Sequence, residues 1–222
     1  MEHGKQPLAG AGRAGIQMSL LPAAWVALLV AGVVLAFLAA ENERLPGDLA
    51  VMRWAQSLPL PGMAVSRFVR VLGATEVVLA AGAILVALLW VFHRRREAVL
   101  LACGLALLPL LQHGLKELVG RPRPTPEVAD LRAGFSSPSF PAGHVMSPTV
   151  LYGFLAYLLL RNGVAWPIAV PMLALSFAVL LLAGPANVYV GVHWPSDVVG
   201  GYVWGLLLLL PLVGLDRLAA RR

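Results

Sequence analysis

Side chains that suit a bound phosphate gather in two stretches of the chain, 116–144 and 187–197. The first stretch opens with Lys116 and continues through Arg121 and Arg123. Cations grouped in this way can hold an anion through charge-assisted hydrogen bonds. Taken one at a time, each is better explained as a side chain that reaches toward the head groups at a membrane boundary. The inference therefore rests on the grouping.

A histidine follows a glycine at the end of the first stretch, in the segment Phe140-Pro141-Ala142-Gly143-His144. An apolar run begins directly after this segment, so we expect Gly143 and His144 at the N-terminus of a helix. Glycine lets the backbone approach a ligand closely, and the free amides of a helix N-terminus favour bound phosphate. For this segment alone, a plain turn with an interfacial histidine is the alternative.

The second stretch ends in His193-Trp194-Pro195-Ser196-Asp197, with the carboxylate four residues after the imidazole. At this spacing Asp197 can reach back to one ring nitrogen of His193. That contact fixes the tautomer and leaves the other nitrogen free to attack phosphorus or to accept a proton. A catalytic zinc would need a third protein ligand, and no further His or Glu stands at ligand spacing nearby. A purely structural His–Asp hydrogen bond is the remaining alternative.

The chain that must position these residues is far more apolar than a soluble protein. Of its 222 residues, 59% are hydrophobic and 13% charged, whereas soluble domains carry roughly one quarter charged residues. We therefore predict an integral membrane protein whose surroundings are the bilayer. The net charge of +6 comes from short basic clusters between apolar stretches, which set topology or meet lipid head groups. Nucleic acid is not expected as a partner, and the single cysteine, Cys103, excludes an internal disulfide.

Six apolar stretches predict an all-α bundle of six transmembrane helices. The first, Ser19–Ala40, is longer than the apolar core of a signal peptide, so we expect it to be retained. The predicted division is a cytoplasmic tail at 1–18, one six-helix membrane domain at 19–216 and a basic cytoplasmic tail at 217–222. The other five stretches are Ala74–Phe92, Ala98–Leu115, Val145–Leu160, Pro167–Gly184 and Val198–Leu215.

The basic cluster 94–96 and the basic C-terminal tail predict the orientation, because cytoplasmic loops carry an excess of Lys and Arg. Both termini are then cytoplasmic, and the segments 41–73, 116–144 and 185–197 lie outside. An even number of predicted spans separates the candidate residues from one another, so all of them fall on this non-cytoplasmic side.

The outer segment 41–73 has a pattern of its own. Leu49, Met52 and Trp54 with Arg53 and Gln56 fit either a short amphipathic helix on the membrane surface or a simple loop. Some arginines of the outer segments can serve a site; besides those already named, they are Arg44, Arg67, Arg70 and Arg132.

In this order, the three motifs resemble those of the type 2 phosphatidate phosphatase superfamily. This family includes lipid phosphate phosphatases, polyprenyl diphosphate phosphatases and the related vanadium haloperoxidases. Its Lys-x6-Arg-Pro, Pro-Ser-Gly-His and Ser-Arg-x5-His-x3-Asp motifs are matched by Lys116, Arg123 and Pro124, by Pro141, Gly143 and His144, and by His193 and Asp197. The resemblance covers residues 116–200 by motif and the whole chain by helix count.

The resemblance implies a role for each matched residue. His193 would form a phosphohistidine, Asp197 would orient it, and His144 would protonate the leaving alkoxide. Lys116 and Arg123 would hold the phosphate. The resemblance implies no metal and no cofactor.

The chain departs from the family pattern at two places. Ala142 stands where the family has serine, and Ala186-Asn187 stands where it has Ser-Arg. A lost charged hydrogen bond is worth about 1.5–3 kcal/mol, and a loss felt only in the transition state would lower the rate roughly 10²- to 10³-fold. We expect Asn187, which keeps an amide donor, and Arg121, which adds a cation near Arg123, to compensate.

Three hypotheses about function follow. The first is a membrane phosphatase that removes the phosphomonoester or diphosphate of a lipid, of the phosphatidate or polyprenyl diphosphate type. The second is a binder or carrier of phosphorylated lipids, which the two departures favour. The third is a phosphotransferase that passes the phosphoryl group to another acceptor. Haloperoxidase chemistry fits least, because membrane spans suit a lipid substrate.

Overall fold

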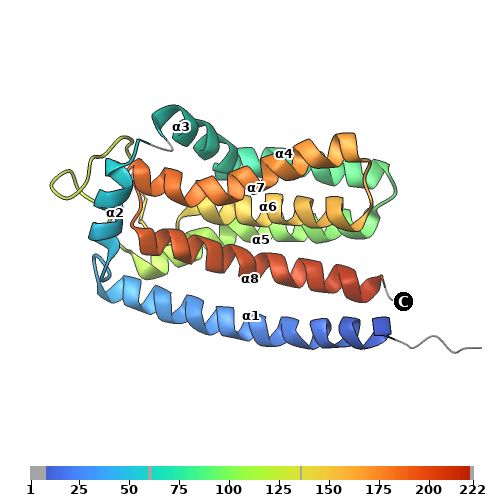
Figure 1. The fold of residues 1–222 in the computed structure, drawn as a ribbon. Helices are drawn as coiled ribbons and strands as arrows, with labels where there is room; N and C mark the ends of the chain where they lie inside the picture. Colours follow the sequence, from blue (N-terminus) through green and yellow to red (C-terminus); the bar gives the residue numbers. More distant parts are fainter. Residues whose placement is uncertain (1–8, 60–61, 136, 221–222) are drawn as a thin grey trace, which may run out of the picture.

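A computed structural model describes residues 9–59, 62–135 and 137–220, and these form eight helices and no strand (Figure 1). The all-α fold predicted from the sequence is therefore confirmed. The helices are α1 (Ala9–Glu41), α2 (Asp48–Ser57), α3 (Gly62–Gly73), α4 (Thr75–Val91), α5 (Arg95–Val119), α6 (Gly143–Arg161), α7 (Trp166–Tyr189) and α8 (Pro195–Ala219).

Five of these helices, α1, α5, α6, α7 and α8, are each long and apolar enough to cross a membrane. Helices α3 and α4, which meet at a bend of 54°, pass the same test when taken together and make a sixth candidate span. The predicted count of six is reached in this way, although α3 was expected only as part of an outer segment. The helix boundaries also differ from the prediction: α1 begins at Ala9, inside the predicted tail 1–18, and α8 continues to Ala219.

The short helix α2 occupies the segment where the sequence left a helix and a loop open. It lies across one end of the bundle, beside the loop 120–142 (Figure 1). Met52 is buried while Trp54 is exposed, as expected for an amphipathic helix that rests on the other helices.

The centre of the bundle is α6, which packs against both α7 and α8 and is buried along most of its length. Helix α6 approaches α8 closely because glycines of α8 face it. A Cβ at Gly205 would lie 2.7 Å from the Cβ of Thr149, and a Cβ at Gly201 would lie 2.7 Å from the carbonyl oxygen of Ala142. Small residues let membrane helices approach in this way. The N-termini of α6 and α8, which carry His144 and Asp197, are thereby held at the same level.

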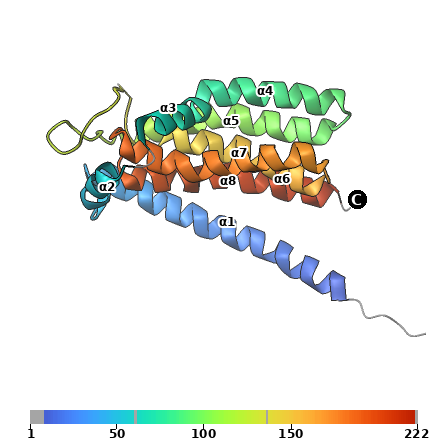
Figure 2. The ribbon, with the colours of Figure 1, turned by 45° about the horizontal axis from the view of Figure 1, so that its top comes forward.

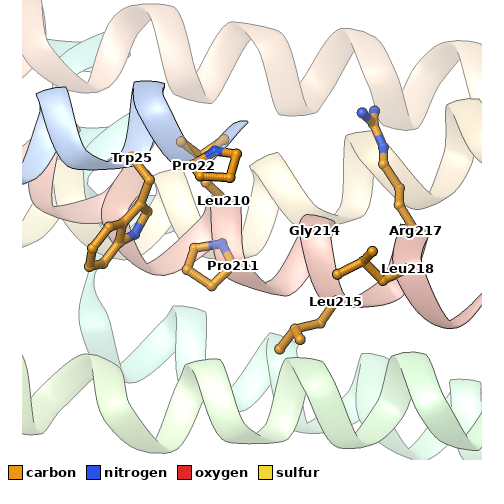
Figure 3. Close-up of a pocket in the computed structure, with 8 residues that line it drawn as sticks. All are labelled: Pro22, Trp25, Leu210, Pro211, Gly214, Leu215, Arg217 and Leu218. Atoms are coloured by element: carbon orange, nitrogen blue, oxygen red, sulfur yellow. The ribbon is translucent and has the colours of Figure 1, made fainter. Parts of the chain in front are cut away.

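Helix α1 lies at the edge of the bundle. It runs beside α8 and diverges from the other helices toward its N-terminal end (Figure 2). The indole of Trp25 donates a hydrogen bond to the carbonyl of Leu207 at 3.0 Å. Between the two helices lies an apolar groove of about 410 Å³ (Figure 3). Its lining includes Pro22, Pro211 and Leu215, near the end of α8 opposite to Asp197.

A buried carboxylate fastens that opposite end. Asp216 of α8 is fully buried and accepts hydrogen bonds from Arg96 Nε at 2.9 Å and from the hydroxyl of Tyr157 at 2.7 Å. Arg161 of α6 also pairs with Asp216. This cluster joins α5, α6 and α8 at the end that the sequence predicts to be cytoplasmic.

At the other end, a fully buried arginine joins three separate segments. Arg121 Nη1 donates to Asp197 Oδ1 at 2.6 Å and to Ser196 Oγ at 2.8 Å, and its Nη2 donates to Asp48 Oδ2 at 2.9 Å. Asp48 also accepts hydrogen bonds from the amide and the hydroxyl of Ser196. The start of α2, the loop after α5 and the start of α8 are thus held together by one charged network.

We predict that Arg121→Ala destabilises the protein strongly, because it leaves two buried carboxylates without their cation. Removing one partner of a buried pair costs about 3–5 kcal/mol, which for a chain of this size corresponds to a melting temperature lower by roughly 10 °C. Thermal unfolding of the purified protein in detergent measures this. Arg53→Ala, at an exposed arginine of α2, is the control, and equal melting temperatures for the two variants would contradict the prediction.

Candidate active site

The residues singled out in the sequence lie at the end of the bundle that α2 and the loop 120–142 cover (Figure 1). Lys116 comes from the last turn of α5, His144 from the first turn of α6, and Asp197 from the first turn of α8. Asn187 lies near the end of α7, and His193 lies in the short connection to α8. Because α5 and α7 end where α6 and α8 begin, the fold brings the motifs to one end.

His193 is buried in the connection between α7 and α8, 1% exposed. Burial lowers its pKa to about 4, with the neighbouring Asp197 opposing this shift and the charge of Arg123 adding to it. The imidazole is therefore neutral at pH 7. Arg123 Nη1 lies 3.3 Å from Nε2 of the ring. As a guanidinium can only donate, this contact favours the tautomer with the lone pair on Nε2 and the proton on Nδ1.

Nδ1 of His193 faces Asp197, as the spacing predicts. The separation from Asp197 Oδ2 is 3.6 Å, longer than a hydrogen bond, and Nδ1 has no closer partner among the described residues. The carboxylate is fixed by other donors: Arg121, the hydroxyl of Ser139 and the backbone amide of Trp194 at 2.9 Å. Contacts of this kind often tighten only when a substrate binds.

Lys116 and Arg123 share a set of neutral acceptors in the loop before α6. Lys116 Nζ donates to Ser137 Oγ at 2.9 Å and to the carbonyl of Pro138 at 3.1 Å. Arg123 donates to the carbonyls of Ser137 and Val192 at 2.7 and 2.5 Å. Burial lowers the pKa of Arg123 to about 10, with Asp197 opposing the shift and Arg70 adding to it, so the guanidinium stays charged at pH 7. The two expected phosphate ligands are therefore side by side.

His144 and Gly143 open α6, as predicted. The ring of His144 is partly buried and meets Phe135 edge to face, with the centroids 5.7 Å apart. At Gly143 a Cβ would lie 3.3 Å from Oε1 of Gln112, so the backbone of α6 begins close to α5. The first amides of a helix have no partner within the helix and can serve an anion here.

The two alanine departures lie together in one apolar cluster. Ala142 and Ala186 are fully buried and belong to a cluster that also contains Val145, Ala183 and Trp194. In this chain both positions serve packing between the ends of α6, α7 and α8.

The structure gives Asn187 a different task from the expected phosphate donor. Its amide nitrogen donates to the carbonyl of Ala183 at 2.7 Å, and its Oδ1 accepts a hydrogen bond from Nη1 of Arg70 in α3. Asn187 is fully buried and so acts as a support for the guanidinium of Arg70.

Arg121 is likewise not placed as expected. The sequence suggested that its charge compensates for the missing arginine, but its side chain is fully buried and its donors go to Asp48, Ser196, Asp197 and the carbonyl of Glu43. It holds the carboxylates and is not free to meet a phosphate, so the expectation is corrected.

Three residues of the site were not identified from the sequence: Arg70, Ser139 and Asp48. Arg70 stood among the arginines of the outer segments, where nothing in its neighbours distinguished it from Arg67. Ser139 and Asp48 are single polar residues outside any motif, and only the folded chain brings them to Asp197 and Arg121.

Comparison with known proteins agrees with this geometry. The sequence model of the PAP2 superfamily matches residues 97–217. A phosphatidylglycerophosphatase B of Bacillus subtilis (strain 168) is 31% identical in an alignment 155 residues long that covers 65% of this chain and 70% of the relative. The crystal structure of a transmembrane PAP2-type phosphatidylglycerolphosphate phosphatase from Bacillus subtilis superposes with a TM-score of 0.74 at 28% identity, covering 87% of this chain and 96% of that one.

The matched region begins in α5 and ends in α8, so it contains all three motifs and the helices that carry them. The structural match extends well beyond the motifs and covers most of the bundle. With the motifs gathered at one end of a helical membrane bundle, the chain belongs to the PAP2 superfamily.

Proposed function

We propose that this chain is a metal-independent lipid phosphate phosphatase that works through a phosphohistidine on His193. The observation that carries the proposal is the position of this buried neutral imidazole, whose Nε2 lies 3.3 Å from the guanidinium of Arg123. A phosphate held by Arg123 would lie in front of the nitrogen that carries the lone pair. The names of the two relatives support a phosphatase acting on a membrane lipid.

The reaction would take place in two steps. Nε2 of His193 attacks phosphorus, the N–P bond forms, and the P–O bond to the lipid breaks while His144 gives a proton to the leaving oxygen. Water then attacks the phosphohistidine, His144 takes a proton from it, and the N–P bond breaks to release phosphate. Asp197 would stabilise the positive charge that develops on the His193 ring.

The substrate is a phosphorylated membrane lipid, either a phosphomonoester or a polyprenyl diphosphate. The relatives make phosphatidylglycerol phosphate the first candidate. Release of inorganic phosphate by the purified protein in detergent, measured for phosphatidylglycerol phosphate, phosphatidate and polyprenyl diphosphate with and without a chelator, tests the proposal. Turnover that requires added metal would contradict it.

We predict that His193→Ala lowers phosphate release at least about 10³-fold, because it removes the nucleophile. Binding of the lipid is expected to persist, since Lys116 and Arg123 remain. His113→Ala, at an exposed histidine of α5 outside the site, is the matched control. A His193→Ala protein with the turnover of the control would rule out this mechanism.

His144→Ala is predicted to slow the first step by roughly 10²- to 10⁴-fold for lipid substrates, which is the usual effect of removing a general acid. The loss should be much smaller for p-nitrophenyl phosphate, whose leaving group departs without a proton. The burst of leaving group in rapid mixing isolates this step. An equal loss for both kinds of substrate would show that His144 is not the acid.

A binder or carrier of phosphorylated lipids is the second candidate, favoured by the departures at Ala142, Ala186 and Asn187. It predicts that the unmodified protein binds the lipid through Lys116 and Arg123 yet releases no phosphate from any member of the panel. Phosphoryl transfer to an alcohol acceptor in place of water would identify the third candidate, a phosphotransferase.

We also propose that the site faces away from the cytoplasm and that both termini are cytoplasmic. In a background with Cys103→Ser, a cysteine at the exposed position Thr125 should react with an impermeant maleimide in intact cells. A cysteine at Arg95, exposed at the opposite end of the bundle, should react only after the membrane is opened. The reverse labelling pattern would overturn the orientation.

A further inference from the structure

Three cationic side chains at the candidate site have no acidic partner among the residues that the structure describes. Lys116 and Arg123 donate only to hydroxyl, carbonyl and imidazole groups, and Arg70 donates to the amide oxygen of Asn187. Among the described residues, none of the three forms an ion pair with a carboxylate, whereas Arg121 forms two. Partly buried cations that lack a counter-ion leave a place for a bound anion.

Arg70 belongs with the other two by position. Its guanidinium packs against one ring, that of Phe135, at 5.0 Å from the centroid, and Arg123 packs against the same ring at 4.8 Å. The ring of Phe135 also meets His144. The charge of Arg70 is close enough to lower the pKa of Arg123. Two arginines and the proposed acid therefore surround one small region.

Helix α3 is built to bring Arg70 there. Its buried residues are Ser66, Val69 and Gly73, which form one face against the bundle. At Gly73 a Cβ would lie 2.7 Å from the carbonyl oxygen of His144, so only glycine lets the end of α3 touch the first turn of α6. Arg70 lies one turn before this contact and is thereby held beside His144.

We propose that Arg70 is a phosphate-binding residue of this chain, a third cation that contacts the phosphoryl oxygens together with Lys116 and Arg123. Asn187 is its positioning residue, because it holds the guanidinium through Oδ1. This inference rests on the proposed function. It also accounts for the departure at position 187, since a cation from α3 reaches the place beside α7 where an arginine at 187 would extend.

Arg70→Ala should lower kcat/KM for phosphatidylglycerol phosphate about 10²- to 10³-fold, the usual effect of removing one donor that stabilises transition-state charge. It should also weaken inhibition by inorganic phosphate, which reports anion binding directly. Arg67→Ala, an exposed arginine on the same helix, should change neither quantity. Arg70→Lys should fall between the two, because it keeps a charge but loses the fork of donors.

The decisive variant is the double change Arg70→Ala with Asn187→Arg. An arginine at 187 extends from α7 into the space that the guanidinium of Arg70 leaves, so turnover and phosphate inhibition should recover. In the presence of Arg70, Asn187→Arg places two guanidinium groups together and should lower activity. Melting temperatures of all variants identify any loss that comes from unfolding.

The two proposals fail differently. If His193→Ala is inactive while Arg70→Ala keeps full turnover and full phosphate inhibition, the phosphatase stands and the role of Arg70 is wrong. The role is equally wrong if folded Arg70→Ala is impaired but the double variant shows no recovery of phosphate inhibition. If the unmodified protein releases no phosphate, the proposed function fails, and phosphate binding by Arg70 is then decided by equilibrium binding of inorganic phosphate to the same variants.

Discussion

The ion pair between Arg121 and Asp197 is the contact on which the end of the bundle that carries the candidate site depends. Both side chains are fully buried, and the separation of 2.6 Å between Nη1 and Oδ1 leaves no room for water. A carboxylate enters such a place only when a cation and further donors satisfy it, and here Ser139 and the amide of Trp194 supply them. The pair thus gives Asp197 a buried counter-ion beside His193 and also joins the loop after α5 to α8.

Arg121 and Arg123 are close in sequence but have different environments. Arg121 neutralises Asp197 and Asp48, and its donors point into the protein. Arg123, two residues later, donates to carbonyl, hydroxyl and imidazole groups and to no carboxylate of the described residues. A regular extended segment would place residues two apart on the same face, so the two guanidinium groups are separated by their different tertiary contacts. The segment Arg121-Pro122-Arg123 therefore gives one cation to the scaffold and one to the site.

The sequence was sufficient to predict the membrane bundle and the meeting of the motifs at one end of it. The bundle follows from the lengths of the apolar stretches, and the shared end follows from the even number of spans between the motifs. Both can be read from the sequence without knowledge of tertiary contacts. It was not sufficient for the roles of Arg121 and Asn187, because whether a polar side chain faces a pocket or a buried partner depends on tertiary contacts. The bend between α3 and α4 was also not predicted; Gly73, at the end of α3, touches the first turn of α6 beside this bend.

The proposed role of Arg70 would let a phosphate site keep its charge while its motif changes. Binding of the anion depends on where the guanidinium group lies and does not depend on which helix carries it. At position 187 an asparagine is short enough to leave that location open and polar enough to hold an arginine that arrives from α3. The arrangement requires the close approach of α3 to α6 at Gly73, so residues 70, 73 and 187 act as one unit. A sequence of this family with asparagine at the position of 187 but a bulky residue at that of 73 would need its third cation from another segment.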